Sequence, residues 1–245
     1  MQYQEDSVNL QSSNLDANTD MPVKNKQEAP NNSQRINNSS RSLVVVKIGG
    51  STFGSDDTTV ADLVKLQKQG FHPVVVHGGG KVVSDWLKKQ GIRPKFIRGL
   101  RVTDQNTLDV VVGVLTGVVN KKLVGEIVLR GGKAVGLSGV DGGILKADAE
   151  NPELGFVGTI KKVDVSALLD ILDGGNIPVL APVAIKQGRG DDPIQLLNIN
   201  ADIAAGEVAA ALKADRLIML TDVPGVLDSS RRVIKRLTQK QAKGL

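Results

Sequence analysis

Two glycine-rich turns in this chain have the residue types of a phosphate-binding site. Residues 47–51 read KIGGS and residues 76–81 read VHGGGK, and each glycine run lies between an aliphatic stretch and a stretch with helical spacing. Glycine lets backbone N–H groups approach an anion closely, and a helix N-terminus adds roughly half a positive charge. A tight strand-to-helix connection would explain one such turn, whereas two of them favour a double anion cradle.

Lys47 lies inside the first aliphatic run, just before the glycines. Burying a lysine without an anionic partner is costly, although the side chain could also reach water at the strand end. The position favours a role in stabilising the charge of a transferring phosphoryl group. His77 is predicted to be a structural residue, since a carboxylate acceptor is ionised near neutral pH and needs no base. His72 is predicted to lie in a surface turn.

Arg101 lies in the segment GLRVTD, residues 99–104, directly before a helical pattern. Its planar guanidinium suits a carboxylate ligand. A salt bridge at the helix start explains the same residue equally well, and the sequence leaves both interpretations open.

The segment NINAD, residues 198–202, places two amides and a carboxylate at a helix start. Ordinary N-capping needs only one of the asparagines. In an extended segment Asn198 and Asn200 point to the same side, which leaves one for the cap and one for a substrate. Asp202 could orient a lysine or bind magnesium through water.

The segment TDVPGV, residues 221–226, follows the last aliphatic run and contains a Pro-Gly turn. Its position at the end of a strand suits a nucleotide contact, because ligands of open parallel sheets bind beyond the carboxyl ends of the strands. The two common phosphate-binding patterns, G-x-x-x-x-G-K-[ST] and G-x-G-x-x-G, do not occur in the sequence. Any nucleotide site is therefore of another kind.

These segments require an α/β scaffold to position them. Hydrophobic residues make up 40% of the chain but aromatic residues only 2%, so Val, Leu, Ile and Ala must form the core, as in a parallel sheet covered on both faces. Alternating patterns predict a three-layer αβα sandwich with a mainly parallel central sheet. The predicted strands are 43–48, 73–77, 134–137, 177–185 and 216–220, and the predicted helices are 58–69, 81–90, 105–130, 166–172 and 201–212.

Composition narrows the class of protein. The net charge of +5 could suggest nucleic acid, but the basic residues are scattered and one Trp and one Tyr offer little for base stacking, so no nucleic-acid partner is expected. The absence of cysteine excludes disulfides and thiolate metal sites. Without an apolar run of about 20 residues or a secretory signal, a cytoplasmic protein with no membrane partner is expected. Residues 1–41 are rich in Asn, Ser and Gln and are predicted to be a disordered extension.

Taken in order, the motifs resemble the amino acid kinase family, and most closely its N-acetylglutamate kinase branch. The resemblance covers essentially all of residues 43–245 and is carried by VKIGGS at 46–51, HGGGK at 77–81, GLRVTD at 99–104, LNINAD at 197–202 and LTDVPGVLD at 220–228. It implies transfer of the γ-phosphoryl group of ATP to the side-chain carboxylate of N-acetyl-L-glutamate, in arginine biosynthesis. It also implies a kinase domain over 42–245, with a substrate lobe at 42–195 and an incomplete nucleotide lobe at 196–245.

The resemblance also implies a role for each candidate residue. Lys47 would stabilise the transition state, and Asp202 would organise the catalytic lysines. Gly79 and Gly80 would bind the substrate and its acquired phosphoryl group, while Arg101 and Asn198 would hold the rest of the substrate. The nucleotide would be contacted by Gly49, Gly50, Asp222, Val223, Pro224, Gly225, Val226 and Leu227. Magnesium would be bound mainly through the ATP phosphates, with no residue assigned as its ligand.

The sequence departs from the family pattern at its end. Family members continue into a Gly-Gly-Met-x-x-Lys segment with a second catalytic lysine, whereas this sequence ends at Leu245. A form that ends there is expected to be catalytically impaired. Residues 1–41 lack the amphipathic pattern of the N-terminal helix that links arginine-inhibited members into hexamers, so a homodimer is expected.

Two alternatives remain open at this point. One is a kinase for a related acidic substrate, such as a carrier-linked 2-aminoadipate. The other is a protein that binds ligands on the same scaffold without catalysis.

Overall fold

Aliphatic strands form a parallel five-stranded sheet at the centre of the fold. The structure is a computed structural model that describes residues 42–49, 58–188, 192–221 and 223–242, all within one compact unit, residues 36–245. The strand order is β11-β1-β2-β8-β5, and the pairings of these strands are all parallel. The strands are β1 (Leu43–Ile48), β2 (His72–His77), β5 (Ala134–Ser138), β8 (Ile177–Ala181) and β11 (Arg216–Leu220).

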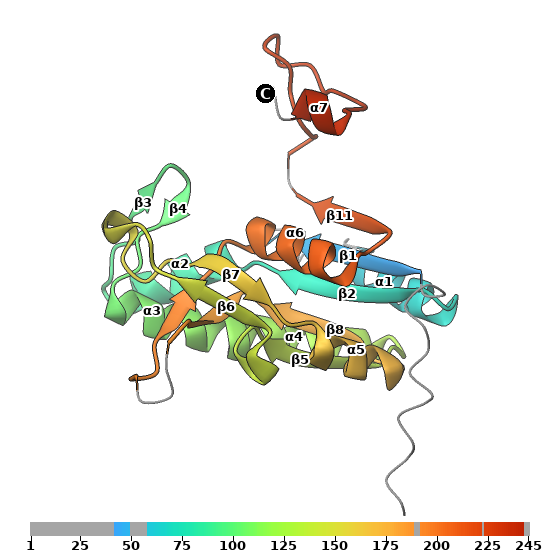
Figure 1. Cartoon of the computed structure of the whole chain (residues 1–245), viewed down its shortest axis with the longest axis horizontal. Coiled ribbons are helices and arrows are strands. Elements are labelled where there is room, and N and C mark those ends of the chain that lie inside the picture. The colour runs from blue at the N-terminus through green and yellow to red at the C-terminus, as the bar shows by residue number, and fades with distance from the viewer. Residues whose placement is uncertain (1–41, 50–57, 189–191, 222, 243–245) are drawn as a thin grey trace, which may run out of the picture. The chain divides into compact units, whose positions relative to one another are not determined.

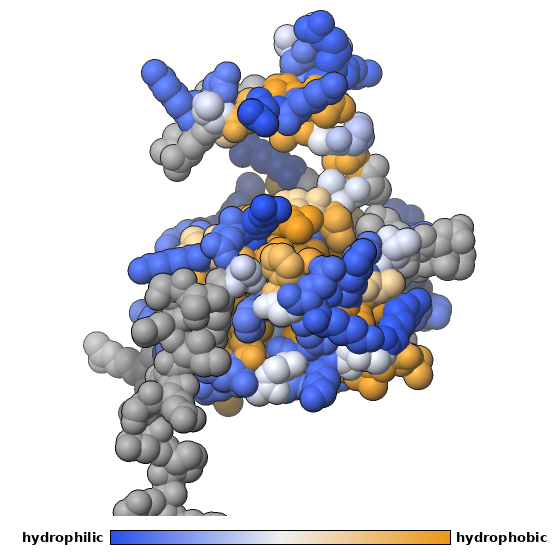
Figure 2. Space-filling view, turned by 90° about the vertical axis from the view of Figure 1, so that its right-hand side faces the viewer, coloured by the Kyte–Doolittle hydropathy of each residue, from blue (hydrophilic) through white to orange (hydrophobic). Residues whose placement is uncertain are grey.

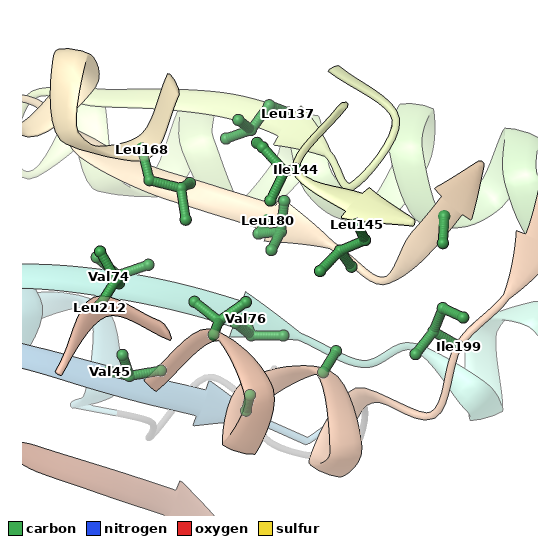
Figure 3. Packing of buried hydrophobic residues seen from close by; sticks show 14 of the residues in the cluster. Val45, Val74, Val76, Leu137, Ile144, Leu145, Leu168, Leu180, Ile199 and Leu212 are labelled. Carbon is green, nitrogen blue, oxygen red and sulfur yellow. The ribbon is translucent and has the colours of Figure 1, made fainter. Parts of the chain in front are cut away.

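Helices cover both faces of this sheet, as Figure 1 shows. On one face, α1 (Thr59–Lys68) and α4 (Asn120–Leu129) pack against the even-numbered residues of β1. On the other face, α5 (Ser166–Asp173) and α6 (Ala201–Leu212) bury Val45, Val74 and Val76, part of the core drawn in Figure 3. Both faces of β1 are buried, which is why its sequence reads as a continuous apolar run. The predicted three-layer α/β fold is confirmed.

A second sheet continues from the carboxyl end of the first. Its order is β10-β9-β6-β7, with antiparallel pairs at both edges and a parallel pair in the middle. The strands are β6 (Leu145–Asp148), β7 (Thr159–Val163), β9 (Val183–Lys186) and β10 (Leu196–Asn198). The predicted single strand 177–185 was wrong, because the chain breaks at Pro182 and its two halves join different sheets.

The segment between α2 (Gly80–Lys89) and β5 holds two further features. A short hairpin, β3 (Phe96–Ile97) and β4 (Leu100–Arg101), comes first. The predicted helix 105–130 follows as α3 (Gln105–Val112), the π-helical segment η3 (Gly113–Val119) and α4, so the helix is continuous but wider in its middle.

The smaller elements complete the description. They are η4 (Asp141–Gly143), η5 (Pro152–Leu154) and α7 (Gln239–Ala242). His72 is a half-buried strand residue whose N–H donates to the Ser42 carbonyl at 3.0 Å, so its assignment to a surface turn was wrong. No helix in the described part of the chain is long and apolar enough to cross a membrane. The predicted extension 1–41 lies outside the described residues.

Candidate functional site

A cavity of about 230 Å³ opens where β1 and β2 end, and we call it the strand-end pocket. Two helices, α2 and α6, begin at its wall, and the hairpin β3–β4 borders it. Six of the residues singled out from the sequence line it together: Lys47, Gly79, Gly80, Arg101, Asn198 and Asp202. Segments far apart in the sequence therefore meet at the carboxyl edge of the sheet, as expected for an open parallel sheet.

Lys47 and Asp202 form an ion pair across the pocket wall. Lys47 Nζ lies 2.9 Å from Asp202 Oδ1, and the side chains are 12% and 54% exposed. Lys47 shares the face of β1 that α6 covers, so the first turn of α6 supplies the anion that a largely buried lysine requires. The prediction that Asp202 could orient a lysine agrees with this geometry.

The helices α2 and α6 begin in different ways. In α6, the Asn200 side chain caps the helix by accepting from the N–H groups of Asp202 and Ile203, at 2.8 and 3.1 Å. In α2, no side chain among the described residues caps the first turn, which begins after Gly79. The open N–H groups of α2 therefore leave a site where an anion can bind.

Gly79 fits this wall because it has no side chain. A Cβ atom there would lie 2.7 Å from Leu115 Cδ2 and 3.2 Å from Val119 Cγ2, so η3 packs directly against the glycine backbone. The π-helical segment thus forms the floor under the start of α2.

Arg101 is 8% exposed and is held by three contacts. Its Nη2 donates to the Gly80 carbonyl at 2.8 Å and to Ser84 Oγ at 2.9 Å, and the guanidinium lies 4.7 Å from the centre of the Phe96 ring. Burial lowers the pKa of Arg101, although a guanidinium keeps its charge in proteins. Its Nη1 is buried and has no hydrogen-bond partner among the described residues. A buried donor of this kind is suited to a ligand carboxylate.

Asp104, and not Arg101, caps the helix that begins after this segment. Asp104 Oδ1 accepts from the Thr107 N–H at 2.8 Å and caps α3, and this hydrogen bond lowers the pKa of Asp104. Among the described carboxylates none pairs with Arg101, so the interpretation of Arg101 as a helix-start salt bridge was wrong.

Asn198 and Asn200 have different hydrogen-bond partners, and the predicted cap is found at Asn200. Asn200 caps α6, whereas Asn198 Nδ2 donates to Thr103 Oγ1 at 3.1 Å. Thr103 is fully buried, and its hydroxyl donates to the Arg101 carbonyl at 3.0 Å. With its nitrogen engaged, Asn198 can offer a ligand its side-chain oxygen as an acceptor.

A model of the amino acid kinase family matches residues 42–244. The chain belongs to the amino acid kinase family. Acetylglutamate kinase from Cereibacter sphaeroides is 46% identical over 205 residues, which cover 82% of this chain and 68% of that protein.

Two solved structures are similar to this chain in fold. The crystal structure of smu.665 from Streptococcus mutans UA159 has a TM-score of 0.73 and 28% identity, with 83% of this chain and 81% of that one covered. The N-acetylglutamate synthase from Neisseria gonorrhoeae, complexed with coenzyme A and N-acetyl-glutamate, has a TM-score of 0.69 and 26% identity. There the match covers 84% of this chain and 48% of the synthase chain.

Gly49 and residues 223–227, which the kinase motifs also single out, do not line the strand-end pocket. Gly49 is buried, and its N–H donates to the Leu220 carbonyl at 3.2 Å. Residues 223–227, which comprise Val223, Pro224, Gly225, Val226 and Leu227, are exposed and do not line the pocket. Gly50 and Asp222 lie outside the described residues.

We call residues 223–242 the C-terminal segment. Its contacts lie mainly between its own residues: for example, Leu227 and Val233 form an antiparallel bridge, and the Ile234 N–H donates to the Val226 carbonyl at 2.8 Å. Val223 and Val226 are 57% and 51% exposed. Hydrophobic and hydrophilic residues lie side by side at the surface in the upper part of Figure 2.

Sequence reasoning missed several residues in and around the strand-end pocket. Phe96 stacks on Arg101, and Ser84 and Thr103 bind Arg101 and Asn198. Phe96 is one of only four phenylalanines in the chain, and this rarity is the one signal that could have drawn attention to it. The described residues contain no group of three or more His, Asp or Glu side chains placed to hold a metal ion.

Proposed function

We propose that this chain transfers the γ-phosphoryl group of ATP to the side-chain carboxylate of N-acetyl-L-glutamate, in arginine biosynthesis. The observation that carries the proposal is the open Nη1 of Arg101 in a pocket that also holds Lys47. The name of the Cereibacter relative and the N-acetyl-glutamate bound to the Neisseria synthase support the same substrate. Nothing in these comparisons supports a carrier-linked 2-aminoadipate instead.

The reaction forms one P–O bond and breaks another. A side-chain oxygen of N-acetylglutamate attacks the γ-phosphorus, the bond from that phosphorus to the β,γ-bridging oxygen breaks, and ADP leaves with the electron pair. The acceptor carboxylate is already ionised near neutral pH, so no side chain has to remove a proton. The protein must instead position two anions and stabilise the negative charge between them.

The pocket residues supply that positioning and charge. Arg101 binds the α-carboxylate of the substrate through Nη1, and Asn198 accepts from its acetamido N–H. The N–H groups at the start of α2, at Gly79 and Gly80, bind the phosphoryl oxygens as the group arrives. Lys47, held by Asp202, neutralises the developing charge.

The residues proposed to bind ATP belong to the glycine turn after β1 and to the start of the C-terminal segment. Gly49 and Gly50 contact the ATP phosphates, while residues 222–227 contact the nucleoside. Mg²⁺ often binds through phosphates with few protein ligands. That mode fits a pocket with a single half-exposed carboxylate, Asp202, which is occupied by Lys47. When bound, the ion would neutralise phosphate charge.

The remaining features are proposed on the same basis. The substrate lobe covers residues 42–195 and the nucleotide lobe residues 196–245, and the chain works as a homodimer in the cytoplasm. The oligomeric state can be measured directly by sedimentation equilibrium.

The test is a coupled assay of the purified chain with ATP and Mg²⁺. We expect ADP release that depends on N-acetyl-L-glutamate, together with an acyl phosphate that hydroxylamine traps. L-Glutamate is the matched control, because it carries a free ammonium in place of the acetamido group that Asn198 would bind. Absence of turnover with N-acetylglutamate contradicts the proposal. A ligand-dependent rise in melting temperature without turnover indicates the non-catalytic alternative.

A further inference from the structure

A buried polar cluster lies behind the strand-end pocket and takes no direct part in the reaction described above. It consists of His77 at the end of β2, Asn120 at the start of α4 and the neighbouring Lys121. His77 and Asn120 are fully buried, so each of their polar atoms requires a partner. The pattern of these partners determines the state of the histidine ring.

The Asn120 amide can take only one orientation. Its Nδ2 donates to the Val179 carbonyl at 2.8 Å and lies 3.3 Å from the Leu137 carbonyl, and carbonyl oxygens only accept hydrogen bonds. Its Oδ1 accepts from Lys121 Nζ at 3.2 Å, and an ammonium only donates. Gly136 leaves room for this arrangement, since a Cβ atom there would lie 2.0 Å from Asn120 Oδ1.

The fixed amide determines the tautomer of His77. The Nε2 atom of the ring lies 3.1 Å from Asn120 Nδ2, a donor, so Nε2 must accept. The ring proton is therefore on Nδ1, which donates to the Gly78 carbonyl at 2.9 Å. Burial, the largest influence, lowers the pKa of His77 to about 4, so the ring stays neutral near pH 7.

The hydrogen bond to Gly78 sets the direction of the next N–H group. In a planar trans peptide the C=O and the N–H point in opposite directions. No cis peptide bond occurs in the described part of the chain, so holding the Gly78 carbonyl toward the buried histidine turns the Gly79 N–H the other way. Glycine has little preference of its own for one backbone rotation, and this peptide plane needs an anchor from outside. Gly78 and Gly79 both line the strand-end pocket.

We propose that Asn120 and His77 are positioning residues for phosphoryl transfer, which act through the Gly78–Gly79 peptide. The Asn120 amide selects the Nδ1–H tautomer of His77, and this N–H holds the peptide so that the Gly79 N–H faces the phosphoryl oxygens. The phosphoryl group as the ligand rests on the proposed function. The hydrogen bonds that lead from Asn120 through His77 to Gly78 are independent of the proposed function.

Two substitutions of His77 separate the two ends of the ring. Asparagine places its amide nitrogen near the position of Nδ1, so His77→Asn can still donate to the Gly78 carbonyl but does not reach Asn120. Glutamine places its amide oxygen near the position of Nε2, so His77→Gln can still accept from Asn120 but offers no donor to Gly78. If the histidine only stabilised the fold, activity would follow the melting temperatures of the two variants.

The positioning role predicts a different order. We expect kcat to fall by about 100-fold in His77→Gln, because a shift of roughly 1 Å in a positioned group costs that much. His77→Asn should lose less than about tenfold, because it keeps the donor that aims the Gly79 N–H. The measurements are kcat, KM for N-acetylglutamate and the melting temperature of each full-length variant. A kcat in His77→Asn no higher than in His77→Gln overturns the proposal.

NMR spectroscopy tests the same inference and does not require the chain to be active. The chain has only two histidines, so ¹⁵N-histidine labelling and His77→Asn assign the ring signals of His77 directly. We expect an Nδ1–H tautomer that does not titrate near pH 6.5, and a Gly79 amide signal that moves in His77→Gln far more than in His77→Asn. A proton on Nε2 contradicts the inference. If the wild-type chain shows no turnover, the proposed function fails, while the tautomer and the Gly79 signal still decide this inference.

Discussion

The strand-end pocket and the C-terminal segment differ in how their functional groups are held. In the pocket, Lys47 and Arg101 are largely buried and have defined partners on other elements. In the C-terminal segment, Val223 and Val226 are about half exposed, and the contacts found there are local. A side chain that is desolvated and oriented before the ligand arrives contributes more to a transition state than one that water still surrounds. Substitutions in the pocket should therefore have much larger effects.

The largest effect is expected for Lys47→Met. The change removes the ammonium that, in the proposed function, stabilises the transferring group, and we expect kcat to fall by about 100- to 1,000-fold, as for loss of a positioned charge-stabilising donor. The melting temperature should change little, since Asp202 is 54% exposed and stays solvated. Steady-state kinetics and thermal denaturation measure both.

Lys65→Met is the matched control for this variant. Lys65 is exposed on α1, which covers the opposite face of the sheet, and its loss should leave kcat unchanged. An equal fall in kcat in Lys47→Met and Lys65→Met would show that the buried lysine contributes no more to catalysis than the exposed one.

Most of the fold, and the meeting of the candidate residues in one pocket, could be predicted from the sequence. The strands β1 and β11 and the helix α6 have the predicted bounds, because continuous aliphatic runs and an asparagine cap are local signals. The pocket brings Lys47 and Asp202 together because parallel strands place their carboxyl ends at one edge.

The parts that could not be predicted depend on contacts between distant segments. The break at Pro182 leaves the apolar pattern intact, so nothing local shows that β8 and β9 join different sheets. Asn120 looks like one more polar residue beside Lys121 in the helical pattern, and its partners His77, Leu137 and Val179 come from three strands. Phe96 lies opposite Arg101 only in the register that the short hairpin β3–β4 adopts, and the sequence alone does not show that register.

The pH dependence of stability tests the buried wall of the pocket. The pKa of His77 is lowered from 6.5 in the unfolded chain to about 4 in the fold. The unfolded state therefore binds a proton as the pH falls below 6.5, whereas the folded state does not until about pH 4. This contribution to stability is complete above pH 6.5 and is lost toward pH 4, by about 3 kcal/mol in total.

Urea denaturation of the wild type and of His77→Asn across this pH window isolates the histidine from the carboxylates. The free energy of unfolding should depend less on pH in the variant. Asp228→Asn is the control in the C-terminal segment, where an exposed pair with Arg232 should contribute little. Parallel curves for the wild type and His77→Asn would contradict a neutral buried His77.

Arg101→Lys should weaken substrate binding more than catalysis. A single ammonium cannot keep the contacts of Nη2 with Gly80 and Ser84 while also presenting a second donor to the ligand. We expect KM for N-acetylglutamate to rise by about 10- to 100-fold, because hydrogen bonds to charged groups contribute about 1.5–3 kcal/mol. Arg93→Lys, at an exposed position before the hairpin, serves as control. An unchanged KM in Arg101→Lys would show that Nη1 does not bind the substrate.

The smallest effect is expected in the C-terminal segment, from Val226→Ser. If ATP covers this half-exposed valine, its loss should raise KM for ATP by up to about tenfold, since burying such a side chain stabilises by about 1.5 kcal/mol. KM for N-acetylglutamate should stay constant, and the free energy of unfolding should change by less than about 0.5 kcal/mol. Val233→Ser alters an exposed valine of the same segment outside residues 222–227 and should leave both KM values unchanged. A larger change in the KM for N-acetylglutamate than for ATP would mean that the C-terminal segment serves the strand-end pocket, and the separation between the two regions would be lost.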